Sequence, residues 1–137
     1  IYPAEALKSM AKECDFLVNT VPLAASTRDL IGADVFSVMK ETAFFIDVSR
    51  GGVVNHAALI NALKEKKIAG AALDVFPDEP LPADDPLWKM PNVIVTPHIS
   101  GISPHYDDRA VALFAQNLQR YLAGDQLLNL VDVGRGY

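Results

Sequence analysis

Short runs of apolar residues recur along the chain and predict the strands of a sheet. Five of the six residues from Ala43 to Val48 are apolar, as expected of a strand buried on both faces of a parallel sheet. The run from Ala69 to Val75 is made of small residues, which allow neighbouring strands to approach closely. The four predicted strands cover residues 16–21, 43–48, 69–75 and 92–96.

Stretches with helical periodicity separate these runs. Asp34 and Asn55 are expected to cap the second and third helices, since their side chains can accept backbone hydrogen bonds. Ser103 is expected to cap a longer final helix that Gly124 ends. Strands that alternate with helices predict an α/β fold with a parallel sheet and right-handed crossovers. The expected helices cover residues 4–12, 35–40, 56–67 and 104–122.

Composition narrows the class of protein. The 137 residues are enough for one domain with a sizeable core. A net charge of −5 argues against nucleic acid or an anionic membrane as a partner, and no apolar run is long enough to span a bilayer. The single cysteine, Cys14, and the lack of a visible signal peptide favour the cytoplasm. The start at Ile1 without a methionine predicts a piece of a longer protein.

Polar side chains follow three successive predicted strands. Arg50 comes after the second strand and is followed by two glycines, Glu79 comes after the third strand, and His98 comes after the fourth. Asp74 lies at the end of the third strand itself. Because parallel strands end at one edge of the sheet, where ligands bind in α/β folds, we expect these residues to converge.

This set of residue types suits the reduction of a keto acid. Arg50 offers a fixed cation and a planar fork of donors for a carboxylate or carbonyl oxygen. His98 is the side chain best suited to exchange a proton, and a carboxylate such as Glu79 would favour its protonated form and hold its ring. The residues alone leave open Arg50 as a surface charge and Glu79 as a solvated loop acid. His56 and His105 are interpreted as surface residues, and no metal-ligand spacing is seen among the histidines and the cysteine.

Three sequence motifs occur in order along the chain. They are Val48-Ser49-Arg50-Gly51-Gly52-Val53-Val54 before a helix, residues 69–76 with Glu79-Pro80, and residues 92–101 around Thr96-Pro97-His98. Together they resemble the D-isomer-specific 2-hydroxyacid dehydrogenases, and Val21-Pro22-Leu23 is similar to the family's loop beneath the nicotinamide ribose. The resemblance extends from about residue 15 to residue 130, and three ordered motifs are far more specific than a lone glycine motif.

The resemblance implies a role for each matching residue. Arg50 would bind the substrate carboxylate or carbonyl, His98 would be the acid/base, and Glu79 would keep His98 protonated in the reductive direction. Asp74 would hydrogen-bond the carboxamide of NAD or NADP. Formate dehydrogenases of the family tend to carry glutamine at the position of Glu79, so the glutamate favours 2-hydroxy acids. The residues implied in cofactor binding are Val21, Pro22, Val48, Ser49, Arg50, Asp74, His98, Ser100 and Gly101.

The resemblance also implies how the chain divides. Residues 1–102 would be the second half of a Rossmann-type, doubly wound dinucleotide-binding domain. Residues 103–137 would be the C-terminal helix and tail, which return toward a substrate domain outside this sequence. The family's Gly-x-Gly-x-x-Gly turn and the acidic residue that reads the ribose are not in this sequence, so NAD and NADP are not distinguished.

The implied activity is NAD(P)-dependent interconversion of small 2-keto acids and D-2-hydroxy acids by a homodimer. The particular acid is not indicated, because most of the substrate pocket would lie outside the sequence. Two other interpretations stay open: a dinucleotide-binding corepressor of the kind that resembles this family, and a non-catalytic α/β module. Residues 1–137 alone are expected to be inactive and to associate through open edges, since the last helix would expose Phe114, Leu118 and Leu122.

Overall fold

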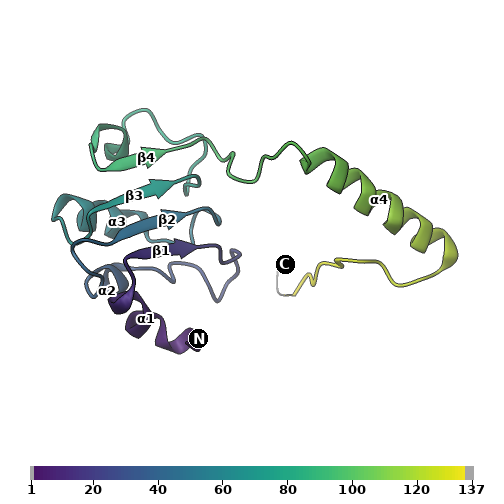
Figure 1. Cartoon of the computed structure of the whole chain (residues 1–137), viewed down its shortest axis with the longest axis horizontal. Coiled ribbons are helices and arrows are strands. Elements are labelled where there is room, and N and C mark those ends of the chain that lie inside the picture. The colour runs from purple at the N-terminus through teal and green to yellow at the C-terminus, as the bar shows by residue number, and fades with distance from the viewer. Residues whose placement is uncertain (1, 135–137) are drawn as a thin grey trace. The chain divides into compact units, whose positions relative to one another are not determined.

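The first part of the chain folds around a four-stranded parallel sheet (Figure 1). The computed structural model describes residues 2–134, and the strands lie in the order β1-β2-β3-β4. Their carboxyl ends are in register, since Asn19 pairs with Asp47 and Asp47 pairs with Leu73. The expected α/β fold with a parallel sheet is confirmed. The strands are β1 (Phe16–Asn19), β2 (Phe44–Asp47), β3 (Gly70–Leu73) and β4 (Val93–Val95).

Helices alternate with the strands along the chain. The described residues form two compact units, one up to His98 and one from Ile99 onward, and α4 belongs to the second. Whether the chain divides functionally at residue 102 stays a prediction. Within residues 2–134 no helix is long and apolar enough to cross a membrane. The helices are η1 (Ala4–Ala6), α1 (Leu7–Glu13), α2 (Ala33–Phe36), α3 (His56–Lys64), η2 (Pro86–Lys89) and α4 (Tyr106–Ala123).

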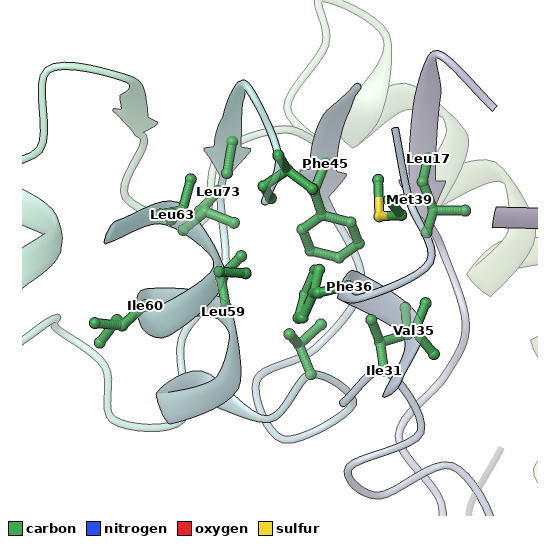
Figure 2. Packing of buried hydrophobic residues seen from close by; sticks show 14 of the residues in the cluster. Leu17, Ile31, Val35, Phe36, Met39, Phe45, Leu59, Ile60, Leu63 and Leu73 are labelled. Carbon is green, nitrogen blue, oxygen red and sulfur yellow. The ribbon is translucent and has the colours of Figure 1, made fainter. Parts of the chain in front are cut away.

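One face of the sheet forms the hydrophobic core (Figure 2). Leu17, Phe45 and Leu73 project from the first three strands, and they belong to one buried cluster with Phe36 of α2 and Leu59 of α3. The rings of Phe36 and Phe45 meet edge to face, with centroids 5.3 Å apart. Truncating a buried phenylalanine of this kind to alanine costs about 3–5 kcal/mol. The core therefore fixes the sheet on whose edge the candidate site lies.

The opposite face of the sheet is exposed, which corrects the expectation that β2 is buried on both faces. Phe16, Phe44 and Ile94 are 63%, 43% and 66% exposed. These residues alternate with the core residues along their strands, so they point away from the core. The apolar residues of β2 follow the pattern of a strand that is covered on both faces. In the unit up to His98, however, the buried residues of the helices pack against one face of the sheet only. The exposure of Phe114, Leu118 and Leu122 on α4 is confirmed.

Helix boundaries follow the sequence signals in part. Asn55 caps α3 as expected, with its side chain accepting a backbone hydrogen bond of 3.0 Å, and Gly124 ends α4 with a φ of 75°. Asp34 lies inside α2 and Ser103 lies ahead of α4, so neither side chain caps its helix as expected. The third helix also ends earlier than expected, at Lys64.

Candidate active site

Arg50, Glu79 and His98 meet at the carboxyl edge of the sheet. Arg50 follows the end of β2, Glu79 lies in the loop after β3, and His98 follows β4. Arg50 Nη1 lies 3.5 Å from His98 Nε2, and His98 Nδ1 lies 2.8 Å from Glu79 Oε2. The three side chains expected to converge therefore form one continuous line, while their catalytic roles stay predictions.

Gly51 allows the Arg50 turn to approach the loop that carries Glu79. A Cβ atom at Gly51 would lie 1.8 Å from the carbonyl oxygen of Phe76 and 2.8 Å from the nitrogen of Pro77. No side chain fits in that space, so only glycine permits this close contact between the two backbones. The next residue, Gly52, has a φ of 93°, which also favours glycine. The glycine pair thus brings the ends of β2 and β3 together.

His98 has an unusual backbone for a residue with a side chain. Its φ of 55° lies in the left-handed region, and strained residues of this kind gather at functional sites. Its side chain is 42% exposed, so small molecules can reach the ring. An ionised carboxylate can only accept hydrogen bonds, so Nδ1 donates to Glu79. Nε2, on the Arg50 side, is left as the nitrogen that can take or give a proton.

Glu79 is held in its ionised form by its surroundings. Desolvation raises the pKa of this carboxyl group, but several interactions outweigh it and lower the pKa overall. The largest are the hydrogen bonds from His98 and from the backbone N–H of Phe76, which donates to Oε1 at 2.9 Å, followed by the positive charges of His98 and Arg50. The acidic loop residue is therefore an oriented carboxylate that fixes the imidazole ring.

A hollow of about 510 Å³ opens beside the imidazole and its carboxylate. Glu79, Thr96 and His98 supply its polar atoms, and the rest of its wall is apolar. Trp88 in this wall is 52% exposed, and its Nε1 donates a hydrogen bond of 2.8 Å to the carbonyl oxygen of Pro82. The apolar lining residues are Phe76, Pro80, Leu81, Trp88, Val95 and Pro97.

A buried network of polar side chains lies next to Arg50, and it was not predicted from the sequence. Asn19 and Asp47 are each 3% exposed and Ser49 is 5% exposed. Asn19 Nδ2 donates to Asp47 Oδ1 at 3.1 Å and to Ser49 Oγ at 2.8 Å, while the Ser49 hydroxyl donates to Asp47 Oδ1 at 2.6 Å. The signal for this network in the sequence is a polar residue at the end of each of two apolar strands, Asn19 in β1 and Asp47 in β2.

The residues implied in cofactor binding lie along the same edge, except for two in the second unit. The Val21 N–H donates to Asn19 Oδ1 at 3.2 Å, Pro22 is exposed, and the Val48 N–H donates to the Asn19 carbonyl oxygen at 3.2 Å. Asp74 is buried, and its Oδ1 accepts a hydrogen bond of 2.5 Å from the hydroxyl of Thr96. Ser100 and Gly101 are exposed residues of the second unit.

That this edge binds the nicotinamide end of a dinucleotide stays a prediction. The half-buried Val21 and Val48 and the exposed Pro22 offer apolar surface for a flat ring, with Arg50 and His98 supplying polar groups. The 137 residues contain no Gly-x-Gly-x-x-Gly turn. Across the described part of the chain, no three His, Cys, Asp or Glu side chains gather as metal ligands do.

His56 is not a simple surface residue, which corrects the interpretation from sequence. Its Nε2 lies 2.8 Å from Asp85 Oδ2, and the two side chains are only 26% and 10% exposed. The other oxygen of Asp85 accepts the backbone N–H of Leu87 at 2.9 Å and so caps η2. The pair thus joins the start of α3 to η2.

Comparisons with known proteins agree with these features. The NAD-binding domain model of the D-isomer specific 2-hydroxyacid dehydrogenases matches residues 2–100. The chain is 43% identical over 126 residues to a glyoxylate reductase of Korarchaeum cryptofilum, covering 92% of this chain and 38% of that protein. It is 43% identical over 129 residues to glyoxylate/hydroxypyruvate reductase B of Pectobacterium carotovorum, covering 92% and 39%. The chain therefore spans about two fifths of the length of these relatives.

Solved structures show the same likeness. A D-isomer specific 2-hydroxyacid dehydrogenase from Xanthobacter autotrophicus, in complex with NADPH and MES, matches 97% of this chain and 54% of its own at 44% identity with a TM-score of 0.90. An NADPH-dependent glyoxylate/hydroxypyruvate reductase from Sinorhizobium meliloti, in complex with NADP and sulfate, matches 99% and 44% at 34% identity with a TM-score of 0.89. The four parallel strands and their flanking helices are thus a Rossmann-like fold, and the chain belongs to the NAD-binding domain of the D-isomer specific 2-hydroxyacid dehydrogenases.

Proposed function

We propose that the whole protein interconverts a small 2-keto acid and a D-2-hydroxy acid with NAD or NADP. The observation that carries this proposal is the line of contacts from Arg50 through His98 to Glu79. It joins a cation for the substrate anion, an accessible imidazole for a proton and a carboxylate that holds the ring. Relatives named glyoxylate reductase and glyoxylate/hydroxypyruvate reductase support this substrate class.

In the reductive direction, His98 gives a proton to the carbonyl oxygen of the keto acid from Nε2. Glu79 keeps Nδ1 hydrogen-bonded at 2.8 Å and stabilises the charged ring before this transfer. Arg50 binds the substrate carboxylate or polarises its carbonyl, where a planar fork of donors is most effective. A bound nicotinamide dinucleotide supplies the hydride that the carbonyl carbon receives. The product is an alcohol, and the reverse reaction returns the proton to His98.

The remaining residues of the edge are assigned to cofactor binding. Val21, Pro22, Val48 and the backbone of Ser49 and Arg50 would hold the nicotinamide end of a bound dinucleotide. Asp74 would accept a hydrogen bond from the carboxamide of that dinucleotide. Ser100 and Gly101 keep the cofactor-binding role that the family resemblance implies for them. Both nicotinamide dinucleotides are retained as candidates, and the neighbours from Xanthobacter and Sinorhizobium were solved with NADPH and NADP.

The organisation of the whole protein follows from the same assignment. Residues 1–102 form the second half of the dinucleotide-binding domain, and residues 103–137 form a helix and tail that return toward a substrate domain. The exposed apolar side chains of α4 support a homodimer. The net charge of −5 and the single cysteine support a cytoplasmic protein without nucleic-acid or membrane partners. Sedimentation of the full-length protein tests the dimer, which a monodisperse monomer would exclude.

The activity is tested with full-length protein and a panel of 2-keto acids that includes glyoxylate and hydroxypyruvate. Each acid is mixed with NADH or NADPH, and oxidation of the cofactor is followed by absorbance. We expect turnover with at least one pair and a D-2-hydroxy acid as product. Binding of dinucleotide by calorimetry without turnover of any acid would instead favour the corepressor-like or non-catalytic interpretation.

A further inference from the structure

The buried network of Asn19, Asp47 and Ser49 lies outside the proposed catalytic line. All three side chains are almost inaccessible, at 3%, 3% and 5% exposure, so none of them meets the substrate directly. Resting on the proposed function, we propose that Asp47 and Asn19 are positioning residues that hold Ser49 and thereby place the Arg50 guanidinium for the keto acid.

A single carboxylate oxygen organises the end of β2. Asp47 Oδ1 accepts hydrogen bonds from the Ser49 N–H at 3.0 Å, from the Ser49 hydroxyl at 2.6 Å and from Asn19 Nδ2 at 3.1 Å. Asn19 Nδ2 also donates to Ser49 Oγ at 2.8 Å. Ser49 is therefore held through its backbone and its side chain together, which leaves its peptide little freedom to rotate.

The position of the Arg50 guanidinium depends on the orientation of the Ser49 peptide. Arg50 Nη1 donates to the carbonyl oxygen of Ser49 at 2.7 Å, and the same nitrogen lies 3.5 Å from His98 Nε2. Because Arg50 is exposed, its placement rests on these contacts rather than on packing. A rotated Ser49 peptide would move both the carbonyl oxygen and the start of the arginine side chain, and so separate the guanidinium from the imidazole.

The network also joins the two loops implied in cofactor binding. Asn19 Oδ1 accepts the Val21 N–H at 3.2 Å, so one asparagine contacts the loop after β1 and the turn after β2. Burial raises the pKa of Asp47, against the opposing hydrogen bonds from Ser49 and Asn19. Apolar side chains could fill the same space without the cost of burying a carboxyl group. The network therefore fixes the geometry of the loops rather than adding to the free energy of unfolding.

The experiment measures steady-state kinetics of the full-length protein with the 2-keto acid that it turns over fastest. We expect Asp47→Ala to raise KM for the keto acid about tenfold, the range for losing one hydrogen bond to a charged group. Asp47→Asn keeps a carbonyl oxygen in the accepting position and should recover most of that loss. In the background of Arg50→Ala, the Asp47→Ala change should add little, because its effect passes through Arg50.

Two further variants keep the test decisive where Asp47→Ala fails to fold. Ser49→Ala removes only the hydroxyl and should shift KM in the same direction by a few fold, with the same loss of effect in the Arg50→Ala background. Ile68→Ala, in the core and 1% exposed, should lower stability while leaving KM unchanged. Losses at Asp47 or Ser49 that remain fully additive with Arg50→Ala would overturn the positioning role. Absence of turnover in the wild type would instead overturn the proposed function.

Discussion

Two histidine–carboxylate pairs of the same length lie in very different surroundings. His98 and Glu79 are 2.8 Å apart, as are His56 and Asp85. The side chains of the first pair are 42% and 35% exposed, and those of the second are 26% and 10% exposed. Only the first pair has a guanidinium beside it, 3.5 Å from the imidazole, among the contacts of the described residues.

The two rings also present different nitrogens to their carboxylates. His98 uses Nδ1, so its Nε2 lies on the side of Arg50, whereas His56 uses Nε2. Asp85 in addition caps η2, while Glu79 accepts only a loop N–H besides the imidazole. The pairing distance alone therefore does not identify an acid/base. We expect the greater accessibility of His98 and the guanidinium beside its Nε2 to distinguish a catalytic pair from a structural one.

The largest expected difference between the pairs is in turnover. We expect His98→Ala to lower kcat by about a hundred- to ten-thousand-fold, the usual contribution of a positioned general acid. His56→Ala serves as the matched control and should keep kcat within about twofold, since His56 lies outside the proposed catalytic line. Steady-state assays of both full-length variants check this difference. A His98→Ala variant at the wild-type rate would end the assignment.

A substitution at Gly51 should affect both regions through the backbone. The residue lines the same small space as His56 and Phe76, and its missing Cβ would meet the Phe76 carbonyl at 1.8 Å. We expect Gly51→Ala to destabilise the fold by about 3 kcal/mol, because backbone atoms must move to admit the methyl group. Denaturant unfolding measures this loss. Gly32→Ala, whose Cβ would have its nearest contact at 3.4 Å, is the control and should cost far less.

Removal of the second carboxylate should affect stability rather than turnover. Asp85→Ala loses the hydrogen-bonding contact with His56 and the cap of η2, and we expect a cost of about 1–2 kcal/mol. Asp84→Ala, at an exposed neighbouring position, should stay within about 0.5 kcal/mol of the wild type. Thermal unfolding and kcat are measured on the same samples. Unchanged stability with reduced kcat would reverse the roles given to the two pairs.

The smallest effect concerns the pH dependence of stability at Glu79. Its pKa is lowered in the fold from the ordinary 4.5, so its ionised form stabilises the fold above that pH. This contribution is lost as the pH falls through the lowered pKa. The Glu79→Gln variant should therefore approach the wild type in free energy of unfolding on acidification. Because the pair is exposed, the difference should stay below about 1 kcal/mol. A gap that widens on acidification would contradict the lowered pKa.

The meeting of Arg50, Glu79 and His98 could be predicted from the sequence for a simple reason. Arg50, Glu79 and His98 each follow a strand of a parallel sheet, and the topology alone brings strand ends to one edge. The family motifs add their expected roles. The four strands and the cap at Asn55 could be predicted because each depends on residues near in sequence.

The missed features depend on contacts between distant segments. Asn19 meets Asp47 through the register of β1 and β2, and His56 meets Asp85 across 29 positions of sequence. Neither pairing leaves a periodic signal. β2 was expected to be buried on both faces, but Phe44 is 43% exposed. The reason is the same, because an apolar strand pattern does not show whether another segment covers each face of the strand.

The pH profile of kcat/KM tests the central claim most directly, namely that the exposed pair transfers the proton. In the wild type, one limb of this profile reports the ionisation of the essential acid or base of the free enzyme. We expect that limb to be absent from His98→Ala and present in His56→Ala, both measured with the same keto acid and cofactor. A limb that persists in His98→Ala, or one that is lost only in His56→Ala, would contradict the assignment of proton transfer to His98.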